Sequence, residues 1–256
     1  MDYSKKCYEK TALFKVIVRL DFRNFIETNL LFQDGIINNI LDIFPNKSMR
    51  QLVSFQTMNM TFNPNENKTE RTVKNGAQQN FFDESGNRLV LTNMFVAIEI
   101  KKYTTFDALK NRLALFQTIF DKCNVVISRT GIRYINLFDD DTIRPQKRYF
   151  KAPVSALATL HLSPEKDEVC IRSLNTTEFQ MEDMRLNFRY GQYNPAYPQP
   201  INRPHFVLDF DCFYGGSVEK YAEVMDHVDR GHDAVQRLFE DSISDTLRKV
   251  MGEKSK

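Results

Sequence analysis

Four charged residues in two predicted strands are the clearest candidates for a functional site in this chain. The segment "SRTGIRYINLF" (128–138) alternates like a β-strand, and it places Arg129 and Arg133 on one face. At the usual strand rise, their Cα atoms lie about 13 Å apart. The later strand "VLDFD" places Asp209 and Asp211 together on one face. Guanidinium groups bind carboxylates and phosphates, so these residues predict either internal ion pairs or a site for an acidic ligand.

Both interpretations use the same polar sheet face, and the sequence leaves both open. In the first, the arginines pair with the aspartates across neighbouring strands, and each pair stabilises the fold by only about 0.2–1 kcal/mol. In the second, the face binds a protein partner or a small anion. Tyr134 and Asn136 have the opposite parity in the strand, so they join the arginines only near a strand end or a bulge. The candidate contact residues are Arg129, Arg133, Tyr134, Asn136, Asp209 and Asp211.

A metal-dependent enzyme that uses Asp209 and Asp211 is another hypothesis, because paired carboxylates can perform acid–base or metal chemistry. The sequence offers no third ligand at a suitable spacing. The four histidines form no HExxH motif, and His232 lies on an apolar helical stripe, where a hydrogen-bonded core histidine is expected. The four cysteines are scattered, without zinc-ligand or disulfide spacing. We therefore expect no metal and no cofactor, and we lean against catalysis.

The segment "RPQKRYFK" (144–151) suggests nucleic-acid binding as an alternative. It interleaves basic groups with Tyr149 and Phe150, which suits phosphates and stacked bases, although an ordinary surface loop has the same composition. A net charge of +2 gives no long-range attraction to nucleic acid or anionic membrane, so binding would depend on this local patch. The basic candidates are Arg144, Lys147, Arg148 and Lys151.

Composition favours an ordinary folded protein. The 256 residues are 42% hydrophobic and 27% charged, which suffices for one large domain or two small ones joined tightly. The 21 phenylalanines argue for packing, since their rings carry no polar group. The opening "MDYSKKCYEK" lacks the apolar region of a signal peptide, and no apolar run reaches the length of a membrane span. Together with the scattered cysteines, this predicts a cytoplasmic protein with reduced thiols.

Hydrophobic periodicity predicts a mixture of strands and helices. The polar segment 63–79 is expected to be a mobile loop. A turn at 84–87 predicts a hairpin, and Thr105 is expected to cap a helix. The main predicted strands are 14–22, 51–62, the two strands of the hairpin 81–103, 125–138 and 205–213. The main predicted helices lie within 25–45, at 106–122 and at 218–251.

The order of these elements suggests an internal repeat. Phe95, Val96 and Tyr103 recur as Phe206, Val207 and Tyr214, each shifted by 111 positions. We therefore predict an α+β fold of two pseudo-repeated halves, 1–123 and 124–256, each running strand–helix–three strands–helix. The halves are expected to share a mostly antiparallel sheet with helices on one face. The apolar stripe of the long C-terminal helix would also permit self-association.

The central motif resembles a known family. "RTGIRYIN" (129–136) is similar to the R-x-G-[IL]-R-Y-[IV]-N signature of a sporadically distributed, uncharacterised bacterial family of similar length. The strand "VLDFD" and the closing segment "HDAVQRLFEDSISDTLRKVMG" (232–252) also resemble its C-terminal pattern. The resemblance implies an accessory bacterial system, such as a defence locus, and it supplies no catalytic residues.

The leading hypothesis is accordingly a non-catalytic binding or regulatory module that recognises a protein partner or a small anionic ligand. Its alternatives are nucleic-acid binding through 144–151 and metal-dependent catalysis by Asp209 and Asp211.

Overall fold

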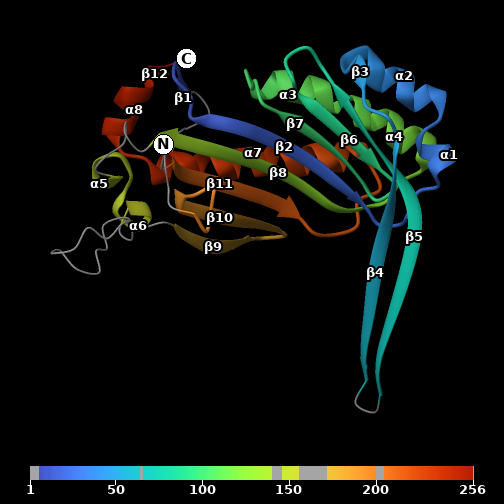
Figure 1. Ribbon diagram of the computed structural model, residues 1–256. Helices are drawn as coiled ribbons and strands as arrows, with labels where there is room; N and C mark the ends of the chain where they lie inside the picture. The colour runs from blue at the N-terminus through green and yellow to red at the C-terminus, as the bar shows by residue number, and fades with distance from the viewer. Residues whose placement is uncertain (1–5, 64–65, 140–145, 156–171, 200–204, 256) are drawn as a thin grey trace. The chain divides into compact units, whose positions relative to one another are not determined.

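The computed structural model describes residues 6–63, 66–139, 146–155, 172–199 and 205–255 (Figure 1). Contacts between residues divide the chain into two compact units. The predicted halves were contiguous in sequence, whereas the first unit combines distant segments. Unit 1 consists of residues 1–18, 130–215 and 222–256, and unit 2 consists of residues 19–129 and 216–221.

The predicted α+β class with a mostly antiparallel sheet is confirmed. Among the described residues, ten strands share a sheet with the order β3-β5-β6-β7-β2-β8-β11-β10-β9, and β4 pairs with β5 outside this path. A separate pair joins β1 (Lys6–Tyr8) to β12 (Glu253–Ser255). The ten strands are β2 (Leu13–Phe22), β3 (Asn46–Lys47), β4 (Gln51–Asn63), β5 (Glu66–Phe82), β6 (Arg88–Thr92), β7 (Phe95–Ile100), β8 (Ile127–Asp139), β9 (Ser173–Met181), β10 (Met184–Tyr193) and β11 (His205–Tyr214).

Helices follow the predicted regions, but two predicted helices are broken. The helix predicted at 106–122 consists of α3 (Phe106–Leu113) and α4 (Leu115–Cys123). The C-terminal helix begins later than predicted and is broken, because α7 ends at Ser242 and Ser244 caps the separate helix α8 by accepting from Leu247 N at 3.3 Å. The predicted cap at Thr105 is confirmed, since its hydroxyl accepts from Ala108 N at 3.1 Å. The helices are α1 (Thr28–Leu31), α2 (Asp34–Ile43), α3 (Phe106–Leu113), α4 (Leu115–Cys123), α5 (Gln146–Tyr149), α6 (Ala152–Ser155), α7 (Tyr221–Ser242) and α8 (Asp245–Met251).

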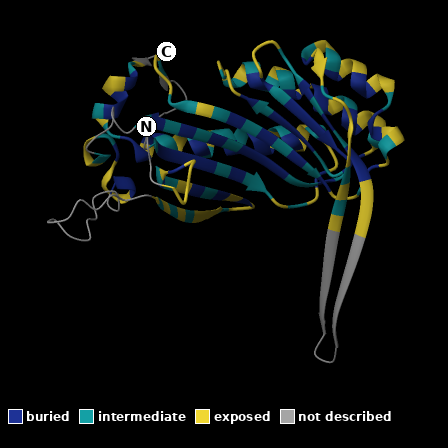
Figure 2. Ribbon diagram, viewed as in Figure 1, coloured by how far each residue is buried: buried dark blue, intermediate teal, exposed yellow. Residues whose placement is uncertain are grey.

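In unit 1, the strands bury one face against α7 (Figure 1). The Tyr134 hydroxyl lies 2.8 Å from His232 Nδ1, and the rings of Phe210 and Phe239 are 6.3 Å apart. At Gly231 the helix backbone comes so close that an added Cβ would lie 2.7 Å from Ile132. Figure 2 shows the resulting alternation of buried and exposed positions along these strands. The α7 part of the stripe that would permit self-association is therefore already packed on the chain's own sheet, whereas Val250 on α8 is 48% exposed.

In unit 2, the segment predicted as a loop is a strand. Polar composition suggested a loop at 63–79, but most of it belongs to β5, which pairs in register with β4 from Gln51↔Gln78 to Asn63↔Glu66. That prediction is wrong because backbone hydrogen bonds to β4 form the strand without an apolar face. The hairpin at 84–87 is confirmed: Gly86 has φ 75° and its N–H donates to Asp83 O at 3.1 Å.

Candidate functional site

The sheet face of unit 1 that points away from α7 contains the predicted arginine–aspartate pair, and we call it the outer face. Arg133 in β8 donates from Nε to Asp209 Oδ1 at 2.7 Å and from Nη2 to Asp209 Oδ2 at 2.6 Å. This is a two-pronged guanidinium–carboxylate contact between neighbouring strands. Asp209 is only 6% exposed. Its hydrogen bonds raise the pKa of Arg133 above the usual value, so the guanidinium stays charged.

A second arginine approaches the same carboxylate from the other side. Arg189 in β10 is the register partner of Asp209, and its Nη1 lies 3.6 Å from Asp209 Oδ2. The Arg189 side chain is 45% exposed. Arg185 is also exposed on the same strand face, four residues earlier, where its Nε donates to Gln180 Oε1 at 3.3 Å. Asp211 lies opposite Arg133 in the register and adds negative charge at the β8 side.

Sequence reasoning did not single out Arg185 and Arg189, although the signal was present. In "MRLNFRY" the polar residues Arg185, Asn187 and Arg189 alternate with Leu186 and Phe188. Leu186 and Phe188 are buried. An alternating strand next to the aspartate strand therefore supplies the most exposed cations of the outer face.

Tyr134 and Asn136 do not belong to this group, which corrects the six-residue contact set. They lie on the opposite face, at 7% and 6% exposure. The Tyr134 hydroxyl contacts His232, and Asn136 Nδ2 donates to Leu208 O at 3.3 Å. The strand has no bulge that would turn them outward, since β8 and β11 pair without interruption from Thr130 to Asp139. Their roles are structural.

Arg129 lies in unit 2, where it takes part in a cluster of similar composition. Its Nη1 is 3.7 Å from Asp21 Oδ2, while Arg19 donates to Asp21 Oδ1 from Nε at 2.8 Å and from Nη2 at 2.5 Å. The Arg19 guanidinium also stacks on Phe95, 3.8 Å from the ring centroid. Two arginines again share one carboxylate.

The basic–aromatic segment loses one of its two aromatic rings to the core in the folded chain. Arg144 lies outside the described residues. Lys147 and Arg148 are exposed on α5, and Lys151 Nζ lies 3.7 Å from Asp241. Phe150 is 1% exposed and stacks on Phe206 with ring centroids 4.4 Å apart. An aromatic ring inside the core cannot stack on a base.

Metal chemistry finds little support in the described part of the chain. There, no three His, Cys, Asp or Glu side chains gather as a metal site would require. Asp209 is occupied by two guanidinium groups. His227 stacks on Tyr214 with ring centroids 4.0 Å apart, and its Nε2 lies 3.9 Å from Asp183 Oδ2. His161 lies outside the described residues.

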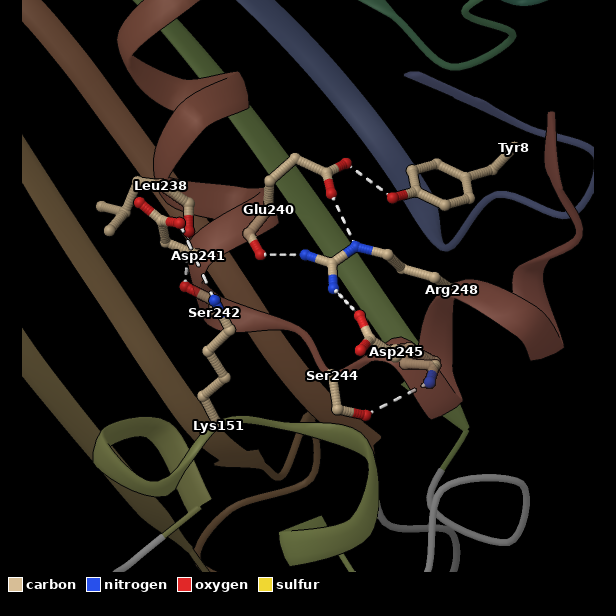
Figure 3. Close-up of polar contacts among 10 residues, drawn as sticks. Tyr8, Lys151, Leu238, Glu240, Asp241, Ser242, Ser244, Asp245 and Arg248 are labelled. Atoms are coloured by element: carbon tan, nitrogen blue, oxygen red, sulfur yellow. Dashed lines mark hydrogen bonds and ion pairs between the residues drawn. The ribbon is translucent and has the colours of Figure 1, made fainter. Parts of the chain in front are cut away.

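A buried charged cluster in unit 1 was missed by sequence reasoning (Figure 3). Glu240 in α7 is 1% exposed; its Oε1 accepts from the Tyr8 hydroxyl at 2.6 Å and its Oε2 accepts from Arg248 Nε at 3.0 Å. Arg248 in α8 also donates to Asp245 at 2.7 Å. Burial and the neighbouring carboxylate raise the pKa of Tyr8, so the phenol stays protonated. The cluster joins β1, α7 and α8, and its sequence spacing has no recognisable signature because the helix break creates it.

Compared with models of protein families and with curated proteins, the chain matches none. Within the described ranges, no helix is both long enough and apolar enough to cross a bilayer.

Proposed function

We propose that this chain is a non-catalytic binding module that recognises an acidic protein partner or a small anionic ligand through the outer face of unit 1. The observation that carries the proposal is the Arg133–Asp209–Arg189 cluster. One carboxylate fixes Arg133 by two hydrogen bonds, while Arg189 stays 3.6 Å away with its side chain 45% exposed. Arg189 therefore keeps hydrogen-bonding capacity for an incoming carboxylate or phosphate.

The burial of Asp209 supports a positioning role. Removing a carboxylate from water costs free energy that an ion pair often fails to recover, and exposed pairs add little stability. A 6% exposed aspartate beneath two arginines is thus poorly explained by stability alone. It is well explained as a device that holds guanidinium groups in place before a ligand arrives, which reduces the entropic cost of binding.

The cationic part of the outer face lies along β10. Arg185 and Arg189 are exposed and four residues apart, about 13 Å along the strand. At the β8 side, Arg133 faces two carboxylates, Asp209 and Asp211, so that side has no excess of positive charge. A ligand that follows β10 with two acidic groups at a similar spacing would meet both arginines. An extended acidic peptide meets this description better than a single small anion.

Two alternative functions carry weaker support. For nucleic-acid binding, the exposed cations Lys147 and Arg148 remain, but Phe150 is committed to the core. For metal-dependent catalysis, Asp209 would have to give up Arg133. The accessory or defence-related bacterial setting rests on the motif resemblance, and it stays part of this proposal.

We also keep the internal repeat as a proposal. The order β5-β6-β7-β2 has the same pattern as β9-β10-β11-β8, and each set is interrupted and followed by helices. Under the 111-residue shift, β7 corresponds to β11. The clusters Arg19–Asp21–Arg129 and Arg133–Asp209–Arg189 do not occupy equivalent strands, so recognition is proposed for unit 1 alone.

A labelled hexaglutamate peptide tests the function, with inorganic phosphate as competitor. The double substitution Arg185→Gln/Arg189→Gln should raise the peptide Kd about tenfold, because two charged hydrogen bonds are lost. Arg237→Gln is the matched control, since Arg237 is exposed on α7. Its Kd should equal that of the wild type. Failure of the wild type to bind either probe, or equal weakening by both variants, contradicts the proposal.

A further inference from the structure

The two-stranded ribbon of β4 and β5 has an outer edge that pairs with no other described strand of the chain. Among the described residues, β4 pairs only with β5, and no strand covers its outer edge. β6 pairs with β5 only from Gln78 to Phe82. Figure 1 shows the ribbon running beyond the strands of its own unit. Two strands alone are marginally stable in water, and a third strand is normally needed for stability.

Specific contacts anchor the ribbon at its base, where it joins the rest of unit 2. Asn93, which is 0% exposed, accepts from Ala77 N at 2.6 Å and donates to Ile26 O at 2.6 Å. Phe25 packs edge-on against Phe55, with ring centroids 6.0 Å apart. Lys74 Nζ lies 5.2 Å from the centroid of the Phe25 ring. The ribbon therefore leaves unit 2 from a packed base with specific hydrogen bonds, and this base anchors its first residues.

The sequence of the edge strand contains none of the charged residues or prolines that commonly prevent pairing. Its sequence, "QLVSFQTMNMTFN", has 13 residues without a charge, a proline or a glycine. Natural edge strands usually carry lysine, proline or a bulge for protection. Leu52 is 91% exposed, and Met49, just before the strand, is 87% exposed. At the usual rise the edge is about 43 Å long.

We propose that β4 pairs antiparallel with β4 of a second copy of this chain, which makes a four-stranded sheet β5–β4–β4–β5 across a two-fold axis. Two-fold symmetry brings a strand against itself, so like residues meet near the axis. An uncharged strand tolerates this. By contrast, the other edge of the ribbon belongs to β5, whose sequence carries Glu66, Lys68, Glu70, Arg71 and Lys74. Charged side chains of this kind commonly protect an edge strand against pairing.

Charge also favours a second copy over nucleic acid. β4 and β5 together carry three basic and two acidic residues. A β-ribbon that reads DNA needs an excess of basic groups for the phosphates. This interface is independent of the outer face of unit 1, so either can fail without the other.

The test measures the dimer dissociation constant of the full chain by sedimentation equilibrium. Leu52→Lys/Gln56→Lys places two charges on the edge strand, and it should raise this constant at least about tenfold, because like charges from the two copies repel each other across the two-fold axis. Val73→Lys is the control, since Val73 is the register partner of Gln56, is 53% exposed and lies on β5. It should leave the constant nearly unchanged.

A charge-swap mixture separates pairing from misfolding. Leu52→Glu/Gln56→Glu should also dissociate alone, whereas an equimolar mixture with the lysine variant should recover a heterodimer. A wild-type chain that stays monomeric at all concentrations overturns the proposal. So does a dimer that the β4 charges leave intact, or one that the mixture fails to restore.

Discussion

At the scale of single residues, the chain uses buried ionisable groups to fix the directions of others. Asp209 holds Arg133 and approaches Arg189, and Asp21 holds Arg19 and approaches Arg129. In each case a carboxylate sits between two more exposed guanidinium groups, with the Asp209 side chain 9% exposed and that of Asp21 22%. Such groups contribute position more than stability, because burial of the carboxylate offsets much of the attraction between the charges.

His227 is expected to make the stability of the fold depend on pH. Burial lowers the pKa of His227 from its usual 6.5, and the nearby Asp183 carboxylate opposes this only in part. In the unfolded chain, His227 therefore binds a proton near pH 6.5, whereas in the folded chain it binds the proton only at lower pH. Stability is full above this pH and falls as the pH drops through the window below 6.5, by about 1.4 kcal/mol for each unit of pKa lowering.

Urea unfolding at pH 7.5, 6.5 and 5.5 checks this prediction. His227→Phe keeps a ring to stack on Tyr214 but cannot titrate. The unfolding free energy of the wild type should fall more steeply between pH 7.5 and 5.5 than that of the variant. Parallel curves for the two proteins would show that His227 titrates alike in the folded and unfolded chain. The lowered pKa of Asp83 acts separately, because its stabilising effect is lost only as the pH falls below 3.8.

At the scale of elements, the break between α7 and α8 creates the Glu240–Arg248–Tyr8 cluster. In one continuous helix, residues 240 and 248 would lie about 12 Å apart along the axis, because the rise is 1.5 Å per residue. That distance is too long for their side chains to share a hydrogen bond. The turn at Ile243 and Ser244 brings them to 3.0 Å. The cluster could not be predicted from the sequence, because the apolar stripe continues through the break and therefore indicated a single helix.

A double-mutant cycle measures this element-level coupling. Glu240→Gln should destabilise the fold by about 3 kcal/mol, because it leaves the Arg248 guanidinium buried without its carboxylate. Arg248→Met should destabilise the fold by a similar amount, because it leaves the buried Glu240 carboxylate without its guanidinium partner. The double variant Glu240→Gln/Arg248→Met should cost far less than the sum of the two single variants, as measured by urea unfolding. Additive losses would mean that the two side chains do not act as a pair.

At the scale of the whole molecule, periodicity predicted more than composition did. Alternation at 14–22, 128–138 and 205–213 located β2, β8 and β11, and it put Arg133 and Asp209 on one face, because period-two patterns record which face is buried. Polar composition failed at 63–79, since a paired ribbon needs no apolar face. The parity of Tyr134 and Asn136 already placed them away from the arginines. The helix break and the buried cluster depend on tertiary packing, which local periodicity does not encode.

The outer face of unit 1 as an anion-recognition surface is the central claim, and arginine side-chain NMR tests it most directly. In a titration of the full chain with hexaglutamate, the Nε–Hε signals of Arg185 and Arg189 should shift and saturate together. The signal of buried Arg248 and that of exposed Arg237 should stay in place, because one is enclosed and the other lies on α7. Unchanged Arg185 and Arg189 signals, or equal shifts at Arg237, would contradict the account.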